Sequence, residues 1–486
     1  MTTHYLACDL GAESGRLMLG SLDAGKLSLE ELHRFPNTPI KSDGSLCWDI
    51  PRLFGQLKAG LRKAGALKVP IASISTDSWG VDYLLIDARS EIIPPVFHYR
   101  DPRTARGVAR VRASVGWPNI FDETGIQFMP LNTLYQLATE PSERLARAER
   151  ILMIADAFNF FLCGQAAIEE SNASTTQFYN PSTRQWSKKL LAALNLPERL
   201  LPAIVPSGTR LGRLRKELAD ETGLPPMEVI ASCSHDTGAA VAAVPADSST
   251  SWAYLSSGTW SLLGVELPAP LITDACREMN FTNEIGYGGS VRLLKNISGL
   301  WLVRECRRAW AAGGQHLDYE TLIKLAAETS PFVSLINPMD ARFVAPENMP
   351  EAIAAFCRET GQPAPTMPGA FIRCTLESLA MLYRRTFRQI EQLVRRKIER
   401  LYVVGGGSRN ALLNQFTADA LQIPVLAGPV EATAAGNVLV QAITLGHVNS
   451  LSAAREIVRD SLPASRVNPN AAAPWDSAWE RFTKLC

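Results

Sequence analysis

The sequence has no excess of charge of either sign and no long apolar run. Its 486 residues include 49 basic and 48 acidic side chains, a net charge of +1. A chain without a basic block has little electrostatic attraction for nucleic acid or an anionic membrane. No window approaches the roughly 20 apolar residues of a membrane span, and the N-terminus lacks the pattern of a signal peptide. We therefore expect a cytoplasmic protein that binds small molecules, with no nucleic acid, membrane or obligate protein partner.

Metal-ligating patterns are missing as well. The nine cysteines contain no C-x-x-C pair and the six histidines no H-x-x-x-H spacing, so we expect no zinc site built by the protein. An odd, scattered set of cysteines fits reduced thiols better than a disulfide framework. Cys357 and Cys374 can lie near each other, and the sequence leaves their pairing open.

The length of the chain and its alternating strand and helix patterns predict an α/β protein of more than one domain. A single core rarely supports so many residues. We expect an N-terminal domain over residues 1–246 and a C-terminal domain over residues 252–445, joined by the small, polar stretch 245–251. Residues 446–486 are expected to form a tail whose C-terminal helix packs back on the body.

Local patterns give the first elements. Residues 5–10 and 16–22 are apolar strand candidates on either side of a small, polar turn. Residues 48–65 carry apolar side chains at the period of an amphipathic helix, with Asp49 at the N-cap position. Residues 252–267 repeat the plan of the opening hairpin, which suggests a duplicated domain.

The opening turn, DLGAESGR (residues 9–16), has the composition of an anion-binding loop. Gly11 and Gly15 permit tight backbone geometry, so that consecutive N–H groups can face phosphate oxygens. Arg16 can add charge, and Asp9 can hold Mg²⁺ through water. The segment is not a Walker P-loop, because its lysine is absent. An ordinary glycine hairpin remains the alternative.

Two further turns have the same character. Residues 256–259 supply hydroxyls and amides in a Ser-Ser-Gly-Thr turn, a common sequence when taken alone. The three glycines of residues 405–407 lie between a buried strand and a helix, where a flat group can approach the backbone. Their pattern does not match G-x-G-x-x-G, so an adenosine platform is favoured over a dehydrogenase.

The segment SHDT brings His235, Asp236 and Thr237 to the end of a small apolar strand. The helix that follows favours the ionised form of Asp236. Such a carboxylate can accept the proton of a substrate hydroxyl that attacks phosphorus. An N-cap aspartate is the alternative interpretation. An actin-like or chaperone-like ATPase has little use for this acid, which disfavours that class.

Two stretches are candidates for substrate lining. TDSWGVDY places Trp79 and Gly80 between the carboxylates Asp77 and Asp82, and an indole face with acceptors beside it suits a sugar. Asn296 is predicted at the start of an apolar helix, where its amide can reach a hydroxyl. A core tryptophan and a helix-capping asparagine are the alternatives.

Taken together, five segments resemble the FGGY carbohydrate kinases: DLGAESGR, TDSWGVD, SHDTGAAV, YLSSGTWS and VVGGGSRN. The resemblance covers nearly the whole chain. It implies two ribonuclease-H-like domains of the actin/hexokinase-type ATPase fold around a nucleotide and sugar cleft. It also implies transfer of the γ-phosphoryl group of ATP, with Mg²⁺, to the 1-hydroxyl of L-rhamnulose. L-Fuculose, a pentulose or glycerol are the alternative substrates.

The resemblance also implies roles for individual residues. Asp236 matches the family's general base. The positions that match its sugar contacts are Gly80, His235, Asp236, Thr237 and Asn296. Those that match its nucleotide contacts are Ala12, Glu13, Ser14, Gly15, Arg16, Thr259, Arg304 and Gly406. Arg304 stands where the family usually has glutamine, which leaves its contact open. Glu13 must point away from ATP or be offset by Arg16 and Mg²⁺.

Overall fold

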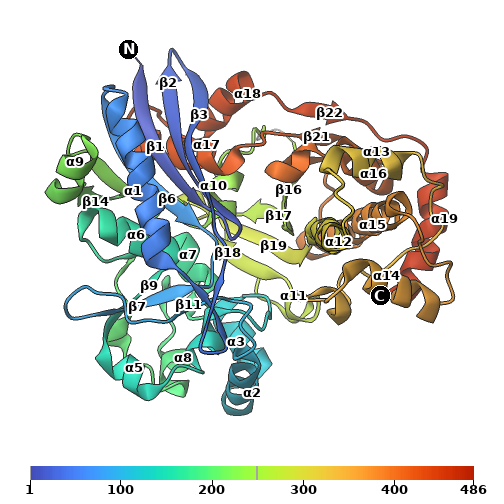
Figure 1. Cartoon of the computed structure of the whole chain (residues 1–486), viewed down its shortest axis with the longest axis horizontal. Helices are drawn as coiled ribbons and strands as arrows, with labels where there is room; N and C mark the ends of the chain where they lie inside the picture. Colours follow the sequence, from blue (N-terminus) through green and yellow to red (C-terminus); the bar gives the residue numbers. More distant parts are fainter. Residues whose placement is uncertain (1, 248–249) are drawn as a thin grey trace. The chain divides into compact units, whose positions relative to one another are not determined.

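The computed structural model describes residues 2–247 and 250–486 (Figure 1). Residues 248 and 249 of the predicted linker stretch therefore lie outside the described part. The contacts between residues divide the chain into two compact units, each made of three segments. Unit 1 contains residues 1–245, 266–293 and 432–462, and unit 2 contains residues 246–265, 294–431 and 463–486. The continuous domain boundaries expected from the sequence remain a prediction.

Unit 1 is built on a six-stranded sheet with the order β14-β15-β6-β1-β2-β3. The strand β1 is antiparallel to β2 and parallel to β6. These pairings confirm the predicted opening hairpin, which the amide of Gly11 closes by donating to the carbonyl of Ser14 at 3.0 Å. The strands are β1 (Thr3–Leu10), β2 (Ser14–Asp23), β3 (Lys26–Pro36), β6 (Ile71–Ser78), β14 (Thr209–Arg213) and β15 (Glu228–Ala231).

Alternate side chains of β1 enter two different apolar clusters. Leu6 and Cys8 join the larger cluster, which includes residues of α1 and α6. Tyr5 and Ala7 join the smaller cluster, which includes residues of α17 and α18. Because successive side chains of a strand point to opposite faces, helices cover this sheet on both sides. These helices are α1 (Ile50–Ala66), α6 (Ile154–Cys163), α17 (Ala432–Thr444) and α18 (Leu451–Ser461).

The predicted amphipathic helix is α1, and its start is confirmed. The carboxylate of Asp49 accepts a hydrogen bond from the amide of Arg52 at 3.1 Å, which is an N-cap contact. Leu53, Leu57 and Leu61 are fully buried along one face. Periodicity and capping chemistry were therefore sufficient to place this element.

The second large sheet repeats the plan of the first. Its order is β18-β19-β17-β16-β20-β21-β22. As with β1, the strand β16 is antiparallel to the next strand in sequence and parallel to the strand on its other side. This repetition agrees with the predicted duplication. The strands are β16 (Trp252–Ser257), β17 (Trp260–Leu267), β18 (Thr282–Ile285), β19 (Val291–Ser298), β20 (Arg400–Val404), β21 (Val425–Ala427) and β22 (Ser465–Val467).

The helices of unit 2 include the C-terminal helix expected from the sequence, α19. Its Trp475 packs against Phe332 and Phe416. Cys357 and Cys374 are buried free thiols on α14 and α15, and a hydrogen bond between the two lowers the pKa of Cys357. The helices are α12 (Trp301–Ala312), α13 (Tyr319–Ala327), α14 (Met349–Glu359), α15 (Pro368–Val394), α16 (Ala411–Leu421) and α19. The last of these spans Ala473–Phe482.

The other elements of unit 1 are short, and most of them lie between strands of its main sheet in the sequence; α10 follows β15, and α11 follows β17. Its remaining strands are β4 (Ile40–Ser42), β5 (Ser45–Trp48), β7 (Tyr83–Asp87), β8 (Val96–Phe97), β9 (Ala148–Met153), β10 (Ile168–Glu169), β11 (Tyr179–Asn180), β12 (Gln185–Trp186) and β13 (Ile204–Val205). Its remaining helices are α2 (Thr104–Ser114), α3 (Trp117–Thr124), α4 (Thr133–Leu137), α5 (Ser142–Arg147), α7 (Glu170–Thr175), α8 (Lys188–Ala193), α9 (Lys216–Thr222), α10 (Asp236–Ala242) and α11 (Asp274–Glu278).

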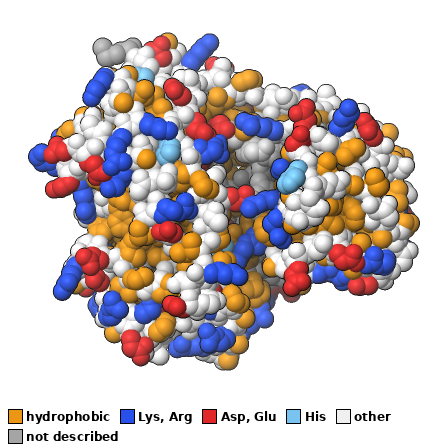
Figure 2. Space-filling view, viewed as in Figure 1, with side chains coloured by type: hydrophobic (Ala, Val, Ile, Leu, Met, Phe, Trp, Pro, Cys, Tyr) orange, Lys and Arg blue, Asp and Glu red, His pale blue; other side chains and the backbone are white. Residues whose placement is uncertain are grey.

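The apolar character of the helices and the charge distribution on the surface are those expected from the sequence composition. Among residues 2–247 and 250–486, no helix combines the length and the apolar character needed to cross a membrane. Figure 2 shows basic and acidic side chains interspersed over the face drawn, with hydrophobic side chains between them.

Candidate active site

The predicted phosphate turn is held by a residue that the sequence analysis did not single out. Asn37 donates its side-chain amide to the carbonyl of Gly11 and its backbone amide to the carbonyl of Glu13, each at 2.9 Å. These two carbonyls are therefore engaged within the protein. At Gly15 an added Cβ would lie 2.3 Å from the ring of Phe35, so only glycine fits there. The turn keeps its backbone fixed and its side chains small.

Asp9 and Arg16 are partners across the hairpin. They are opposite each other in the β1–β2 register, and Nη2 of Arg16 lies 2.5 Å from Oδ2 of Asp9. Arg16, which was predicted to add positive charge beside the turn, thus forms an ion pair with Asp9, the predicted metal ligand. Glu13 is exposed at the tip of the same turn.

Asp9 also faces a second buried acid. Asp77 on β6 is its register partner across the parallel pair and is fully buried. Burial raises the pKa of Asp77 well above its usual value of 3.8, and the charge of Asp9 raises it further. Nδ2 of Asn437 on α17 lies 2.5 Å from Oδ2 of Asp77. The carboxyl of Asp77 therefore points into the protein, toward α17, and its expected role beside a sugar is not supported.

Asp236 is the first residue of α10. Its Oδ1 accepts from the amide of Thr237 at 2.5 Å and from the hydroxyl of Thr237 at 3.1 Å. These bonds favour the charged form, as the sequence predicted. Burial nevertheless raises the pKa of Asp236 to about 7, with a further contribution from the charge of Asp9. Because 31% of the side chain is exposed, water screens part of this effect.

The effect of burial on the pKa outweighs that of the helix start, so the prediction that the helix start keeps Asp236 ionised is wrong. A carboxyl that titrates near neutrality suits a general base, since such a base is most effective when its pKa is close to the working pH.

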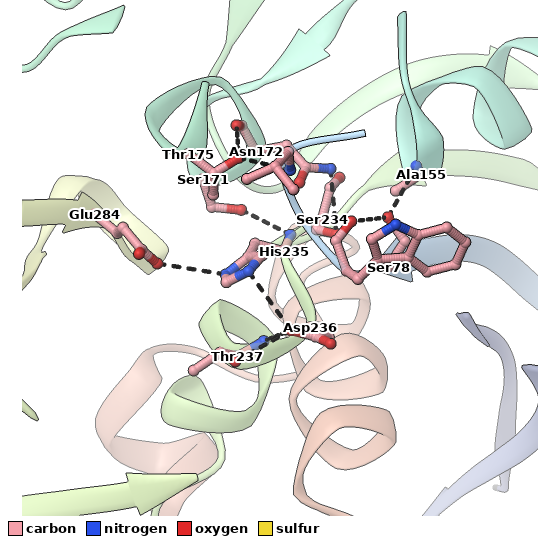
Figure 3. Close-up of polar contacts among 12 residues, drawn as sticks. Ser78, Ala155, Ser171, Asn172, Thr175, Ser234, His235, Asp236, Thr237 and Glu284 are labelled. Atoms are coloured by element: carbon pink, nitrogen blue, oxygen red, sulfur yellow. Dashed lines mark hydrogen bonds and ion pairs between the residues drawn. The ribbon is translucent and has the colours of Figure 1, made fainter. Parts of the chain in front are cut away.

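The backbone before Asp236 is clamped by Glu169, another residue that the sequence analysis missed. Oε2 of Glu169 accepts from the amide of Ser234 at 2.8 Å and also from the hydroxyl of Ser171. The hydroxyl of Ser171 in turn accepts from the amide of His235 at 2.9 Å, a contact drawn in Figure 3. The amide of Ser78 donates to the carbonyl of Ser234 at 2.9 Å. This loop is consequently fixed on both sides before α10 begins.

Gly80 lies against this loop. A Cβ added there would be 2.9 Å from Oγ1 of Thr175 and 3.1 Å from Cδ2 of His235. The structure thus brings Gly80 and His235 together. Trp79 and Trp48 both donate their indole N–H to Oδ2 of Asp82, at 2.9 and 2.6 Å. Asp82 is fully buried, so the expectation that it faces substrate hydroxyls is wrong.

In unit 2, Thr259 and Gly406 follow neighbouring parallel strands. Thr259 is in the turn after β16, and Gly406 is in the turn after β20. A Cβ at Gly407 would lie 2.1 Å from Oγ of Ser257, so the two turns are in close contact. At Gly406 itself a Cβ would have no neighbour within 4 Å. The open backbone at Gly406 matches the predicted platform for a flat group.

Arg304 lies on the first turn of α12, and this helix begins beside the Thr259 turn. The amide of Trp301 donates to the carbonyl of Thr259 at 3.2 Å, and the Arg304 guanidinium lies 5.8 Å from the Trp301 ring centre. Asn296, in contrast, was predicted at the start of this helix but lies on β19. The chain from Val291 to Ser298 pairs as a strand, and the helix begins only at Trp301.

The acidic side chains of unit 1 provide only part of the ligands that a metal site needs. In the described part of the chain, no group of three or more histidine, cysteine or acidic side chains could hold a metal ion. Mg²⁺ is commonly bound by one or two carboxylates together with substrate phosphates. Asp9, with its carboxylate at the base of the phosphate turn, fits that smaller role.

A sheet plan used twice, glycine turns after its strands and an acid at the start of a helix agree with a two-domain carbohydrate kinase. The FGGY family of carbohydrate kinases matches in both parts, its N-terminal domain over residues 4–243 and its C-terminal domain over residues 253–445. The chain belongs to this family.

Two relatives that match nearly the full chain have the same name. Proteins named rhamnulokinase are 43% identical to the chain in Bacteroides thetaiotaomicron, with 99% of each chain covered. In Bacillus subtilis the identity is 40%, with 96% of this chain and 95% of the relative covered. Among solved structures, a gluconate kinase from Lactobacillus acidophilus superposes with a TM-score of 0.82 at 16% identity, covering 100% of this chain and 98% of its own. A glycerol kinase from Plasmodium falciparum gives 0.78 at 15%, covering 99% and 98%. These structural matches establish the fold.

Proposed function

We propose that this protein transfers the γ-phosphoryl group of ATP to the 1-hydroxyl of L-rhamnulose, giving L-rhamnulose 1-phosphate and ADP. The shared name of the full-length relatives supports the substrate. The observation that carries the reaction is Asp236, whose carboxyl is fixed at a helix start and titrates near neutrality.

In this mechanism Asp236 is the general base. It accepts the proton of the 1-hydroxyl as that oxygen attacks the γ-phosphorus. Gly80, His235, Thr237 and Asn296 bind the sugar beside it. The clamp formed by Glu169 supports this role, because it prevents the base from moving away from a bound hydroxyl. A base of this kind contributes about 10² to 10⁴-fold to the rate.

The nucleotide is bound by the phosphate turn and by residues of unit 2. We infer that the backbone of residues 12–16 binds phosphate oxygens, which the engagement of the Gly11 and Glu13 carbonyls by Asn37 supports. Thr259, Arg304 and Gly406 are proposed to contact the rest of the nucleotide. For Arg304 the supporting observation is its position beside the Thr259 turn.

Mg²⁺ bound to ATP would neutralise charge on the transferred group, and Asp9 is the side chain proposed to meet it. The protein itself contributes to the rate by positioning the reacting groups. Fixing the hydroxyl, the base and the phosphates in one geometry supplies most of the acceleration in phosphoryl transfer, because little covalent work remains. Arg16 balances the charge of Asp9 until substrate binds.

We further propose that the enzyme works in the cytoplasm. All nine cysteines belong to the described residues and are free thiols. Free thiols persist where the compartment is reducing.

The decisive experiment is an ADP-release assay with Mg·ATP and a panel of acceptors: L-rhamnulose, L-fuculose, L-ribulose, D-xylulose, glycerol and no sugar. The proposal predicts the highest kcat/KM with L-rhamnulose and no release without sugar. A higher kcat/KM with another ketose would overturn the substrate but keep the kinase. Equal ADP release without sugar would overturn both.

A further inference from the structure

His235 is enclosed by charged groups on two sides, all within unit 1. On one side Nη2 of Arg292 lies 3.2 Å from its Nδ1. On the other side Oδ1 of Asp236 lies 3.6 Å from its Nε2. Oε2 of Glu284 lies 3.7 Å from Nδ1 and 3.2 Å from Nη2 of Arg292. Figure 3 shows the imidazole between Glu284 and Asp236.

These contacts determine which ring nitrogen carries the proton. A guanidinium can only donate, so Nδ1 must accept from Arg292. The proton of a neutral imidazole then resides on Nε2, where it faces a carboxylate that can only accept when ionised.

The environment also keeps the ring uncharged. Burial lowers the pKa of His235 well below its usual 6.5, and the positive charge of Arg292 lowers it further. Arg292 is itself fully buried and is held by the carbonyl of Ile285 at 3.3 Å from Nε and 3.2 Å from Nη2. Glu284 balances its charge. The donor to Nδ1 is thus rigid, which is a requirement for fixing a tautomer.

We propose that Arg292 is a positioning residue that holds His235 as the neutral Nε2–H tautomer, so that His235 donates a hydrogen bond to the C2 oxygen of the ketose. This inference rests on the proposed function, in which Asp236 deprotonates the hydroxyl on the neighbouring carbon. The 3.6 Å separation is too long for a hydrogen bond between Nε2 and Asp236. The N–H can therefore serve an oxygen of the substrate.

The direct test is ¹⁵N NMR of the histidine side chains in the full-length protein, between pH 6 and 8. The chain has six histidines, and the signal of His235 is identified by its loss in His235→Gln. The expected pattern is a neutral ring protonated on Nε2 throughout this range. An Nδ1–H pattern or an imidazolium in the wild-type protein would overturn the inference.

A second test removes the donor. In Arg292→Met, Glu284 is the remaining partner of Nδ1 and can only accept, so the proton should move to Nδ1. The KM for L-rhamnulose should rise about tenfold, the size of one lost hydrogen bond. The KM for ATP should change less than twofold. Arg292→Lys retains a donor and should restore the wild-type tautomer and most of the ketose affinity.

Arg277→Met is the matched control, because that arginine pairs with the exposed acids Asp122 and Asp274 on the surface of the same unit. It should behave as the wild type. If Arg292→Met raises the KM for the ketose while His235 stays protonated on Nε2, Arg292 has only a structural role. If the wild type prefers a different ketose, the proposed substrate fails, and the tautomer measurement still decides the role of Arg292.

Discussion

Asn437 on α17 lies with its Nδ2 2.5 Å from Oδ2 of Asp77 on β6, although 360 residues separate the two in sequence. Oδ1 of Asn437 accepts from Nε2 of Gln441 at 2.7 Å, and Gln441 accepts from the hydroxyl of Ser73 at 2.6 Å. This buried chain of polar groups connects α17 to the strand beside Asp9. The central strands of unit 1 therefore depend on a helix near the end of the chain.

The connection can be tested with Asn437→Ala. The substitution leaves Oδ2 of Asp77 without its partner in a dry environment, and an unsatisfied buried group costs about 1–3 kcal/mol. The Gln441 amide loses one of its two acceptors and keeps its bond to the carbonyl of Leu6 at 3.0 Å. The midpoint of urea unfolding should fall accordingly. Asn119→Ala is the matched control, since its side chain is exposed and caps only the carbonyl of Val115. An unchanged midpoint in Asn437→Ala would contradict the structural role of this bond.

The general base is tested by Asp236→Asn. Asparagine can still accept the hydrogen bonds from Thr237, so the fold and the KM for the sugar should change little. The kcat should fall by about 10² to 10⁴-fold. Steady-state kinetics with L-rhamnulose measures both constants. A variant that retains more than about a tenth of the wild-type kcat would rule out the role of base proposed here.

The pH dependence follows from the raised pKa of Asp236, about 7. Because only the ionised form accepts a proton, kcat/KM should rise with pH and level off above this value. The wild-type profile, measured with L-rhamnulose at saturating Mg·ATP, provides the test. An activity that is independent of pH between 5.5 and 8 would show that a different group limits the reaction.

The same pKa affects stability with the opposite sign. The pKa of Asp236 is about 7 in the folded protein and 3.8 in the reference state, so the folded form binds the proton more tightly. The stabilisation that comes from this tighter proton binding is therefore lost as the pH rises from about 4 to 7. Asp236→Asn should have a Tm close to that of the wild type at pH 4 and a higher Tm at pH 8. A Tm difference that does not grow with pH would contradict the raised pKa.

The contact between α10 and α17 is tested by Gly436→Ala. The added Cβ would lie 1.8 Å from the carbonyl oxygen of Ala239 on α10, the helix that begins at Asp236. We expect a loss of about 1–3 kcal/mol from overpacking, or more, and a lower kcat because α10 must shift. Gly55→Ala on α1 is the control: its Cβ has no neighbour within 4 Å, so it should stabilise the helix by about 0.5–1 kcal/mol. Equal thermal stability of the two variants would count against this packing.

Gly406 and Gly407 should respond differently to the same substitution. Gly406→Ala places its methyl group in open space, so the Tm should be unchanged while the KM for ATP rises about tenfold, or ~1.4 kcal/mol. Gly407→Ala places its methyl group against Ser257 and should lower the Tm. Thermal melting and ATP titration together separate the two effects. An unaltered KM in Gly406→Ala would exclude this turn as the nucleotide platform.

Much of the local structure was predictable because its causes are local. The cap at Asp49 and the apolar period after it specify α1, and the apolar runs around Gly11 specify the opening hairpin. The SHDT motif also predicted that His235 and Asp236 follow the end of a strand. Asn296 was misplaced because KNIS resembles a helix start when its strand partners are unknown.

The family, the repeated hairpin and the residue types of the candidate site follow from the sequence alone, since these depend on short spacings along the chain. Which charged groups meet depends on the folded chain. It placed Asn437 on Asp77, Glu169 under the SHDT loop and Arg292 on His235. Burial then raised the pKa of Asp236 to about 7, although the start of α10 favours the charged form. Desolvation and pairing depend on groups distant in sequence, and no local pattern records them.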